Sequence, residues 1–259
     1  MKNKNHYIIG DVHGEYKTLL ALVEKLPKDA KLVFVGDLVD RGKQSREVIA
    51  YIRANHRTVM GNHEALFCKF ALEFLAYLDG KIRYEEINQR WHKSGRFETF
   101  LSYGLVEVSI EGQFSIVNDS YKNEILRNDI AWMQKNPLYI ELDSKHVSGK
   151  KVIISHSNIS KVWNIRNDKE KRAEFMQTTL WTREHEVDDE AQIFNIFGHC
   201  PQKFEPKITE NYACVDTGCC FSLRKIDHCF RRLSAYCVES GEVFVEKKKE
   251  ELKENSEKV

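Results

Sequence analysis

YIIGDVHGEYKTLLALVEKLPKDAKLVFVGDLVD, residues 7–40, contains the alternation that decides the fold. Two apolar runs, 7–9 and 31–35, have the composition of short buried strands. Between them, leucine and valine recur at helical spacing over residues 17–26. This order of strand, helix and strand is typical of a β-α-β unit, so we predict an α/β fold.

The rest of the chain extends this pattern. A helix is expected at 45–55, with Ser45 as its N-cap, followed by a third short strand at 57–61. Residues 64–136 carry many aromatic side chains and apolar residues at helical spacing, which predicts a mainly helical insertion after the third strand. Further strands are expected at 150–157, 193–200, 211–219, 231–239 and 242–248. Their closer spacing favours a more antiparallel second sheet.

Composition limits the class of protein. The chain has 259 residues, of which 42% are hydrophobic and 31% charged, as expected for a globular domain with a sizeable core. Its 40 Lys and Arg residues balance 39 Asp and Glu residues, which disfavours binding to nucleic acid or to a membrane surface. No apolar run is long enough to span a bilayer, and the first one is too short for a signal peptide. A cytoplasmic location is therefore expected.

Seven cysteines are present, an odd number without any C-x-x-C pair. This pattern predicts reduced, mostly buried thiols rather than a disulfide framework or a structural zinc site. Cys200 stands out because it follows His199. The sequence leaves open whether its thiol faces a site or the core.

Polar side chains stand at or just beyond the ends of five predicted strands. In α/β sheets, residues at the carboxyl ends of strands converge on one crevice. Carboxylate, amide and imidazole groups together suit Mn²⁺, Fe or Zn²⁺ better than Ca²⁺. Enough ligands are present for two metals, including a carboxylate that could bridge them. The residues are Asp11, His13, Asp37, Asp40, Arg41, Asn62, His63, His156 and His199.

Several short motifs carry a family resemblance. They are GDVHG at 10–14, GDLVDRG at 36–42, GNHE at 61–64, ISHS at 154–157, FGHC at 197–200 and VDTGC at 215–219. In this order they resemble the calcineurin-like metallophosphoesterase superfamily, in particular its phosphoprotein phosphatase branch as found in bacteria and phages. The resemblance implies a four-layer β-sandwich flanked by helices. The catalytic domain would span 1–246, and 247–259 would be a charged C-terminal tail.

The resemblance also implies a set of metal ligands. Asp11 and His13 would hold a first divalent ion, and Asp37 would bridge both. The second ion would be completed by Asn62, His156 and His199. Manganese is expected, with iron and zinc as alternatives.

Four further residues match the family's catalytic groups. His63 corresponds to the general acid, and Asp40 to the carboxylate that orients it. Arg41 corresponds to a phosphate-binding arginine. Arg183, in the short motif WTR, resembles a second one.

The implied reaction is hydrolysis of phosphoserine or phosphothreonine in proteins, by direct attack of a metal-bridging hydroxide on phosphorus. One alternative is a bis(5'-nucleosyl)-tetraphosphatase, and another is a non-catalytic metal-bound scaffold. Family members that cleave dinucleotides typically have a non-acidic residue in place of Asp40 and an aspartate in place of Glu64. These two residues therefore favour a phosphoprotein over a dinucleotide as the partner, and the oligomeric state stays open.

Overall fold

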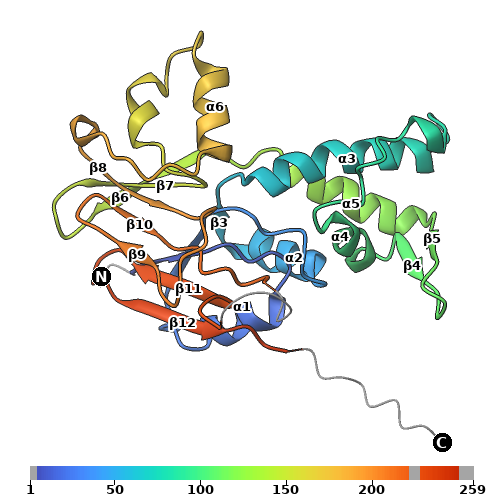
Figure 1. Cartoon of the computed structure of the whole chain (residues 1–259), viewed down its shortest axis with the longest axis horizontal. Coiled ribbons are helices and arrows are strands. Elements are labelled where there is room, and N and C mark those ends of the chain that lie inside the picture. The colour runs from blue at the N-terminus through green and yellow to red at the C-terminus, as the bar shows by residue number, and fades with distance from the viewer. Residues whose placement is uncertain (1–4, 222–227, 251–259) are drawn as a thin grey trace, which may run out of the picture.

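The computed structural model describes residues 5–221 and 228–250, and two five-stranded sheets form its centre (Figure 1). The first sheet has the order β12 (Val243–Lys247), β11 (Arg232–Cys237), β1 (His6–Ile9), β2 (Lys31–Phe34), β3 (Arg57–Thr58). The second has the order β6 (Tyr139–Lys145), β7 (Lys151–Ser155), β8 (Ile193–Phe197), β10 (Tyr212–Cys214), β9 (Lys207–Ile208). Strands β1, β2 and β3 are mutually parallel, as are β7, β8 and β10.

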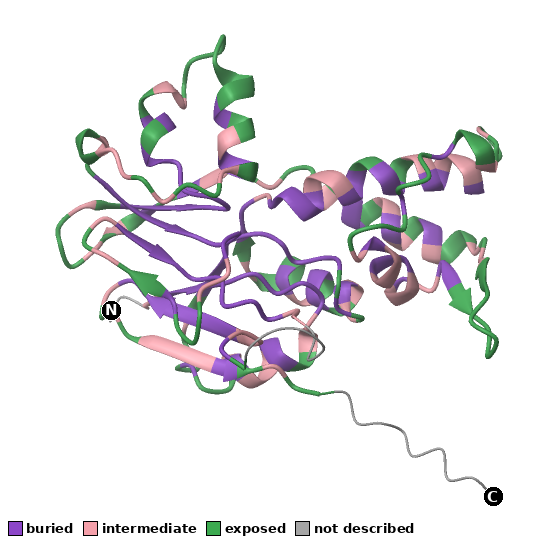
Figure 2. Ribbon diagram, in the orientation of Figure 1, coloured by how far each residue is buried: buried purple, intermediate pink, exposed green. Residues whose placement is uncertain are grey.

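Side-chain alternation along the central strands builds four layers. On β1, Ile8 points into the core between the two sheets, whereas Tyr7 points to the opposite face. Helices α1 (Tyr16–Val23) and α2 (Ser45–Asn55) cover that outer face. Beyond the second sheet, Ile153 packs against Trp163 and Phe175, which come from η2 (Ser160–Ile165) and α6 (Arg172–Trp181). The predicted four-layer α/β architecture is confirmed, and Figure 2 shows its central strands buried.

The segment between β3 and β6 projects away from the sheets (Figure 1). It contains α3 (Asn62–Leu78), η1 (Tyr84–Glu86), α4 (Arg96–Ser102), the β4 (Val106–Val108) and β5 (Phe114–Ile116) hairpin, and α5 (Ser120–Met133). Its aromatic side chains form a core. The ring centroid of Phe74 lies 4.6 Å from that of Phe100 and 5.1 Å from that of Trp91. The segment is mainly helical, as predicted, but the hairpin was not expected. No helix within the described ranges has the length and apolar character needed to cross a membrane.

Two local predictions were wrong. Ser45 is the first residue of α2 rather than its N-cap, which is Gln44, and its Oγ lies 3.2 Å from Thr99 Oγ1. The second sheet is no more antiparallel than the first, since β7, β8 and β10 are parallel and only β6 and β9 run against their neighbours. The antiparallel pair β11 and β12 joins the first sheet instead.

The expected charged tail begins later than predicted. Lys247 is the last residue of β12, and Lys248 forms an ion pair with Glu15 at 2.6 Å. The backbone N–H of Lys249 donates to Thr18 Oγ1 at 2.9 Å. Lys248 and Lys249 therefore contact α1 and the loop before it, while 251–259 lie outside the described residues.

Candidate metal centre

The predicted site residues converge on one cavity of about 170 Å³, whose wall includes all of them except Asp40 and His156, which are fully buried. The segments that follow β1, β2, β3, β7 and β8 contribute all of them except Arg183, which follows α6. Because the parallel strands of both sheets end at the same edge of the molecule, residues far apart in sequence meet there. The side chains that the sequence placed at strand ends therefore lie together in the structure.

Asp37 lines the cavity and lies close to several of its histidines. Its Oδ2 is 3.5 Å from His13 Nε2, and its Oδ1 is 3.4 Å from His156 Nε2. Two groups of potential metal ligands share this carboxylate: His13, Asp37 and His63, and Asp37, His156 and His199, each with its ligand atoms within 4.8 Å of one another. Asp37 therefore has the geometry of a bridge.

Asp11 and Asn62 complete the surroundings of these two groups. Asp11 lines the cavity, and its carboxylate accepts the backbone N–H of His199 at 3.1 Å and 3.2 Å. Asn62 is the first residue of α3, and its Oδ1 lies 2.8 Å from His156 Nε2. The first group contains His63, whereas the resemblance implies Asp11 as the ligand beside His13.

The histidine tautomers fit a bound cation. His156 Nδ1 lies 2.8 Å from the carbonyl oxygen of Val35, which places its proton on Nδ1 and a lone pair on Nε2. That lone pair faces the oxygen of Asn62 at 2.8 Å, so two acceptors point at one another. His199 Nε2, also buried, has no hydrogen-bond partner in the described structure. Such an arrangement is unfavourable unless positive charge is placed among these atoms.

Carboxylates crowd the same cavity. Burial, with Asp216 and Asp37 nearby, raises the pKa of Asp11 well above its usual value. Burial also raises the pKa of Asp216 to about 7. By contrast, burial lowers the pKa of His199 to about 3, and His156 adds to that effect. Neutral imidazoles beside crowded carboxylates are the donor set that a divalent metal stabilises.

Left-handed backbone is concentrated at the site. Among the described residues, nine non-glycine residues have positive φ, and five of these belong to the predicted site. They are His13 (46°), Asp37 (51°), Asp40 (71°), Arg41 (71°) and His199 (65°). Strained conformations of this kind cost free energy and persist where the surrounding structure imposes them.

Asp11 and His13 lie beyond the first strand rather than on it, because β1 ends at Ile9 and His13 is in a left-handed turn. The glycines that flank these two residues allow close backbone contacts. A Cβ on Gly10 would lie 2.2 Å from the oxygen of Val215, and one on Gly14 would lie 2.6 Å from that of Gly42.

His63 and Asp40 form a buried pair. His63 Nδ1 lies 2.6 Å from Asp40 Oδ2, and Asp40 Oδ1 accepts a hydrogen bond from Thr99 Oγ1 at 3.0 Å. Burial opposes protonation of His63, but Asp37 and Asp40 outweigh it and raise its pKa. Such a histidine is suited to donate a proton.

Two arginines face the cavity. Arg41 Nη2 lies 3.0 Å from His63 Nε2, and its Nη1 lies 3.3 Å from Cys220 Sγ. Arg183 is exposed and lines the same cavity from the loop after α6. Both guanidinium groups can therefore reach an anion held beside His63.

Glu64 has a role that sequence reasoning missed. Its carboxylate accepts the backbone N–H groups of Asp37 (2.8 Å), Leu38 (2.7 Å), Val39 (3.2 Å) and Gly61 (3.0 Å). Burial and nearby Asp37 raise its pKa to about 7, while the amide donors oppose that rise. Glu64 thus holds the loop that carries Asp37, whereas the sequence had marked it only as an indicator of substrate.

Asp216 was also missed. It follows β10 and lines the cavity together with Asp11 and Asp37, and its Oδ1 accepts the backbone N–H of Gly218 at 2.8 Å. The strand-end rule could have found it, because VDTGC follows a short apolar run in the same way as the other motifs.

Cys200 belongs to the core. It packs with Phe197, Tyr212 and Cys214, and burial raises the pKa of its thiol to about 11. All seven cysteines are free, and six are buried, as predicted.

Comparison with known proteins agrees with this geometry. Residues 6–224 match the family model described as calcineurin-like phosphoesterase, and the chain belongs to this family. One relative is an asymmetrical bis(5'-nucleosyl)-tetraphosphatase, PrpE, of Geobacillus sp. (strain WCH70). The two sequences are 27% identical over 241 residues, and the match covers 83% of this chain and 85% of the relative.

A second relative is the symmetrical bis(5'-nucleosyl)-tetraphosphatase of Buchnera aphidicola subsp. Baizongia pistaciae (strain Bp), 27% identical over 166 residues. That match covers 62% of the chain and 46% of the relative. Among solved structures, a protein serine/threonine phosphatase from Saccharomyces cerevisiae has a similar fold, with a TM-score of 0.56 and 12% identity over 96% of this chain and 81% of the other. The chain is therefore a metallophosphoesterase, and its substrate is a separate question.

Proposed function

We propose that this protein hydrolyses dinucleoside polyphosphates, as a bis(5'-nucleosyl)-tetraphosphatase with two divalent metal ions. The observation that carries the proposal is the carboxylate of Asp37, whose two oxygens face His13 and His156. The choice of substrate is supported by relatives of that name, one of which aligns with 83% of the chain. This reverses the order favoured by the sequence, which placed phosphoproteins first.

Both groups of ligands share Asp37. Asp11 and His13 would hold one ion with it, and Asn62, His156 and His199 would hold the other, with manganese as the proposed metal and iron and zinc as alternatives. When bound, such ions neutralise phosphate charge and make water a better nucleophile at neutral pH. Backbone carbonyl groups orient the imidazole rings of two of these ligands. His13 Nδ1 lies 2.8 Å from the carbonyl oxygen of Val39, and His156 Nδ1 lies 2.8 Å from that of Val35.

The remaining side chains act on the phosphate and the leaving group. Arg41 and Arg183 would bind the non-bridging oxygens of the reacting phosphate, stabilising charge that moves toward the leaving group. His63 would release a proton to the leaving oxygen. Asp40, 2.6 Å from His63 Nδ1, would hold the ring in place and stabilise its charged form.

A second candidate is a phosphoprotein phosphatase. The buried pair of Asp40 and His63 favours it, because a serine or threonine alkoxide is a poor leaving group that needs a strong proton donor. A nucleotide leaving from a phosphoanhydride needs such help less.

Paired rate measurements separate these functions. Diadenosine tetraphosphate and a phosphoserine peptide would be supplied to the same Mn²⁺-loaded preparation. We expect the higher kcat/KM on the dinucleotide. A higher value on the peptide would establish the second candidate instead, and bound metal without turnover of either would point to a non-catalytic scaffold.

A further inference from the structure

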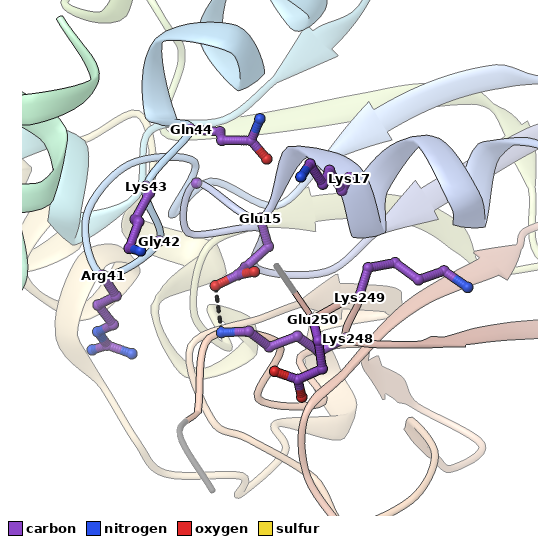
Figure 3. Close-up of a pocket in the computed structure, with 10 residues that line it drawn as sticks. Glu15, Lys17, Arg41, Gly42, Lys43, Gln44, Lys248, Lys249 and Glu250 are labelled. Carbon is purple, nitrogen blue, oxygen red and sulfur yellow. Dashed lines mark hydrogen bonds and ion pairs between the residues drawn. The ribbon is translucent and has the colours of Figure 1, made fainter. Parts of the chain in front are cut away.

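A second cavity lies beside the candidate metal centre. It has a volume of about 310 Å³, and Arg41 lines both cavities. Figure 3 shows its side chains, which come from the loops after β1 and β2, from α1 and from the residues after β12. Its cationic residues are Lys17, Arg41, Lys43, Lys248 and Lys249.

The floor of this cavity is built against the metal-binding loop. The backbone N–H of Gly42 donates to the carbonyl oxygen of His13 at 2.9 Å. A Cβ on Gly42 would lie 2.3 Å from that same oxygen, so only glycine allows the two loops to approach so closely. Because Gly14 and Gly42 line the cavity, it lies next to the loop that carries His13.

Positive charge exceeds negative charge among the described residues of the lining. There, five cationic side chains face two carboxylates, Glu15 and Glu250. Glu15 already pairs with Lys248 at 2.6 Å, as Figure 3 shows, and Glu250 pairs with Arg231 outside the cavity. Lys249 pairs with Glu246, but half of its side chain stays exposed. Both ends of the Arg41 guanidinium contact His63 and Cys220 rather than a carboxylate.

The first turn of α1 adds to the positive electrostatic potential in the cavity. Glu15 occupies the N-cap position, and within the described part of the chain its carboxylate pairs with Lys248 rather than capping the helix amides. The positive end of the helix dipole lies at Lys17, which lines the cavity. Among the described residues, the lining has no aromatic side chain on which a base could stack, so it suits phosphate groups rather than a nucleoside.

We propose that this cavity is a polyphosphate subsite, which binds the phosphate groups beyond the one being hydrolysed. The inference rests on the proposed function in one respect, that the substrate carries a chain of phosphates. Arg41 then contacts the chain where it passes from one cavity to the other. The subsite makes the enzyme prefer polyphosphorylated substrates over single phosphoesters.

The test compares two inhibitors of p-nitrophenyl phosphate turnover, orthophosphate and tripolyphosphate, at a fixed free Mn²⁺ concentration. Lys17→Ala/Lys43→Ala is the test variant. Lys69→Ala/Lys135→Ala removes the same charge from exposed positions outside both cavities and is the control. Because all three proteins meet the same free metal, chelation by tripolyphosphate cancels in the comparison.

We expect tripolyphosphate to inhibit the wild-type protein more strongly than orthophosphate does. The ratio of the two inhibition constants should fall by about fivefold or more in the test variant, as expected for the loss of favourable charge pairs, and stay constant in the control. An unchanged ratio in the test variant, or no preference in the wild type, would overturn the subsite. Calorimetric titration with tripolyphosphate gives the same comparison without turnover.

The outcome is separable from that of the proposed function. If the wild type fails to cleave diadenosine tetraphosphate yet shows the lysine-dependent preference for tripolyphosphate, the subsite stands and the proposed substrate is wrong. If it cleaves the dinucleotide with equal kcat/KM in wild type and test variant, the substrate stands and the subsite is wrong.

Discussion

Glu64 accepts the backbone N–H of Asp37 at 2.8 Å, so a buried glutamate holds the residue that joins the two groups of metal ligands. The same carboxylate accepts N–H groups from Leu38, Val39 and Gly61. The position of Asp37 thus depends on a side chain that belongs to neither group of potential ligands found among the described residues.

Glu64→Gln tests this support. The substitution keeps the size of the side chain but turns an –NH₂ group toward backbone N–H donors, which leaves buried donors unsatisfied. We expect the free energy of unfolding to fall by about 2–3 kcal/mol, measured by urea denaturation. Glu85→Gln, at an exposed position in η1, is the matched control and should have no effect. Equal stability of the two variants would contradict the role of Glu64.

His63→Asn tests the general acid. Because the variant cannot supply a proton, we expect turnover of a phosphoserine peptide to fall about 10²-fold or more. The loss on p-nitrophenyl phosphate should be smaller, since that leaving group needs less protonation. Metal content should remain that of the wild type. A loss of metal would instead make His63 a ligand, as its place beside His13 and Asp37 allows.

Gly198→Ala tests the packing around Asp11. An added Cβ would lie 2.0 Å from Asp11 Oδ1 and 2.6 Å from Val35 Cγ2, so the carboxylate must move. We expect a loss of about 2–3 kcal/mol in stability together with reduced metal content. Gly149→Ala is a suitable control: its Cβ meets nothing within 4 Å, and only its φ of +81° opposes the change. Equal metal content in the two variants would argue against Asp11 as a ligand.

His146 predicts a pH effect far from the site. Its ring stacks on Phe194 with centroids 3.6 Å apart, Nε2 lies 3.0 Å from the hydroxyl of Tyr236, and burial lowers its pKa. The unfolded chain therefore takes up this proton at a higher pH than the folded protein does, and stability falls as the pH drops through about 6.5.

His146→Phe removes the loss of stability that is linked to protonation of His146. Between about pH 7.5 and about pH 5.5, the melting temperature of the variant should fall less than that of the wild type. The change with pH is the quantity to compare, because the variant also lacks the contact with Tyr236, which lowers its stability at every pH. An equal or steeper fall in the variant would contradict the prediction.

Much of the fold and site could be predicted because the signals are local. Short apolar runs followed by Gly-Asp or by histidine mark the ends of parallel strands, and this pattern alone places Asp37 and His156 at one edge of the sheets. The roles of Asp40 and Arg41 follow from the family resemblance, since no spacing rule links residue 40 to residue 63.

Other features depend on contacts between distant segments. The turn at His13 is left-handed because two loops pack backbone to backbone, which periodicity does not report. Glu64 looks like an ordinary first-turn helix residue until its four amide partners are seen. The second cavity needs Lys248 to return to Glu15 across 233 positions. These are the features that sequence patterns missed.

The central claim is that Asp37 bridges two metal ions. Metal content, measured by mass spectrometry after equilibration with Mn²⁺, tests it directly in the wild type and in Asp37→Asn. We expect two ions per wild-type chain and loss of at least one in the variant, because the amide lacks the charge and the second anionic oxygen that a bridge requires. Two ions bound in Asp37→Asn, or a single ion in the wild type, would contradict it.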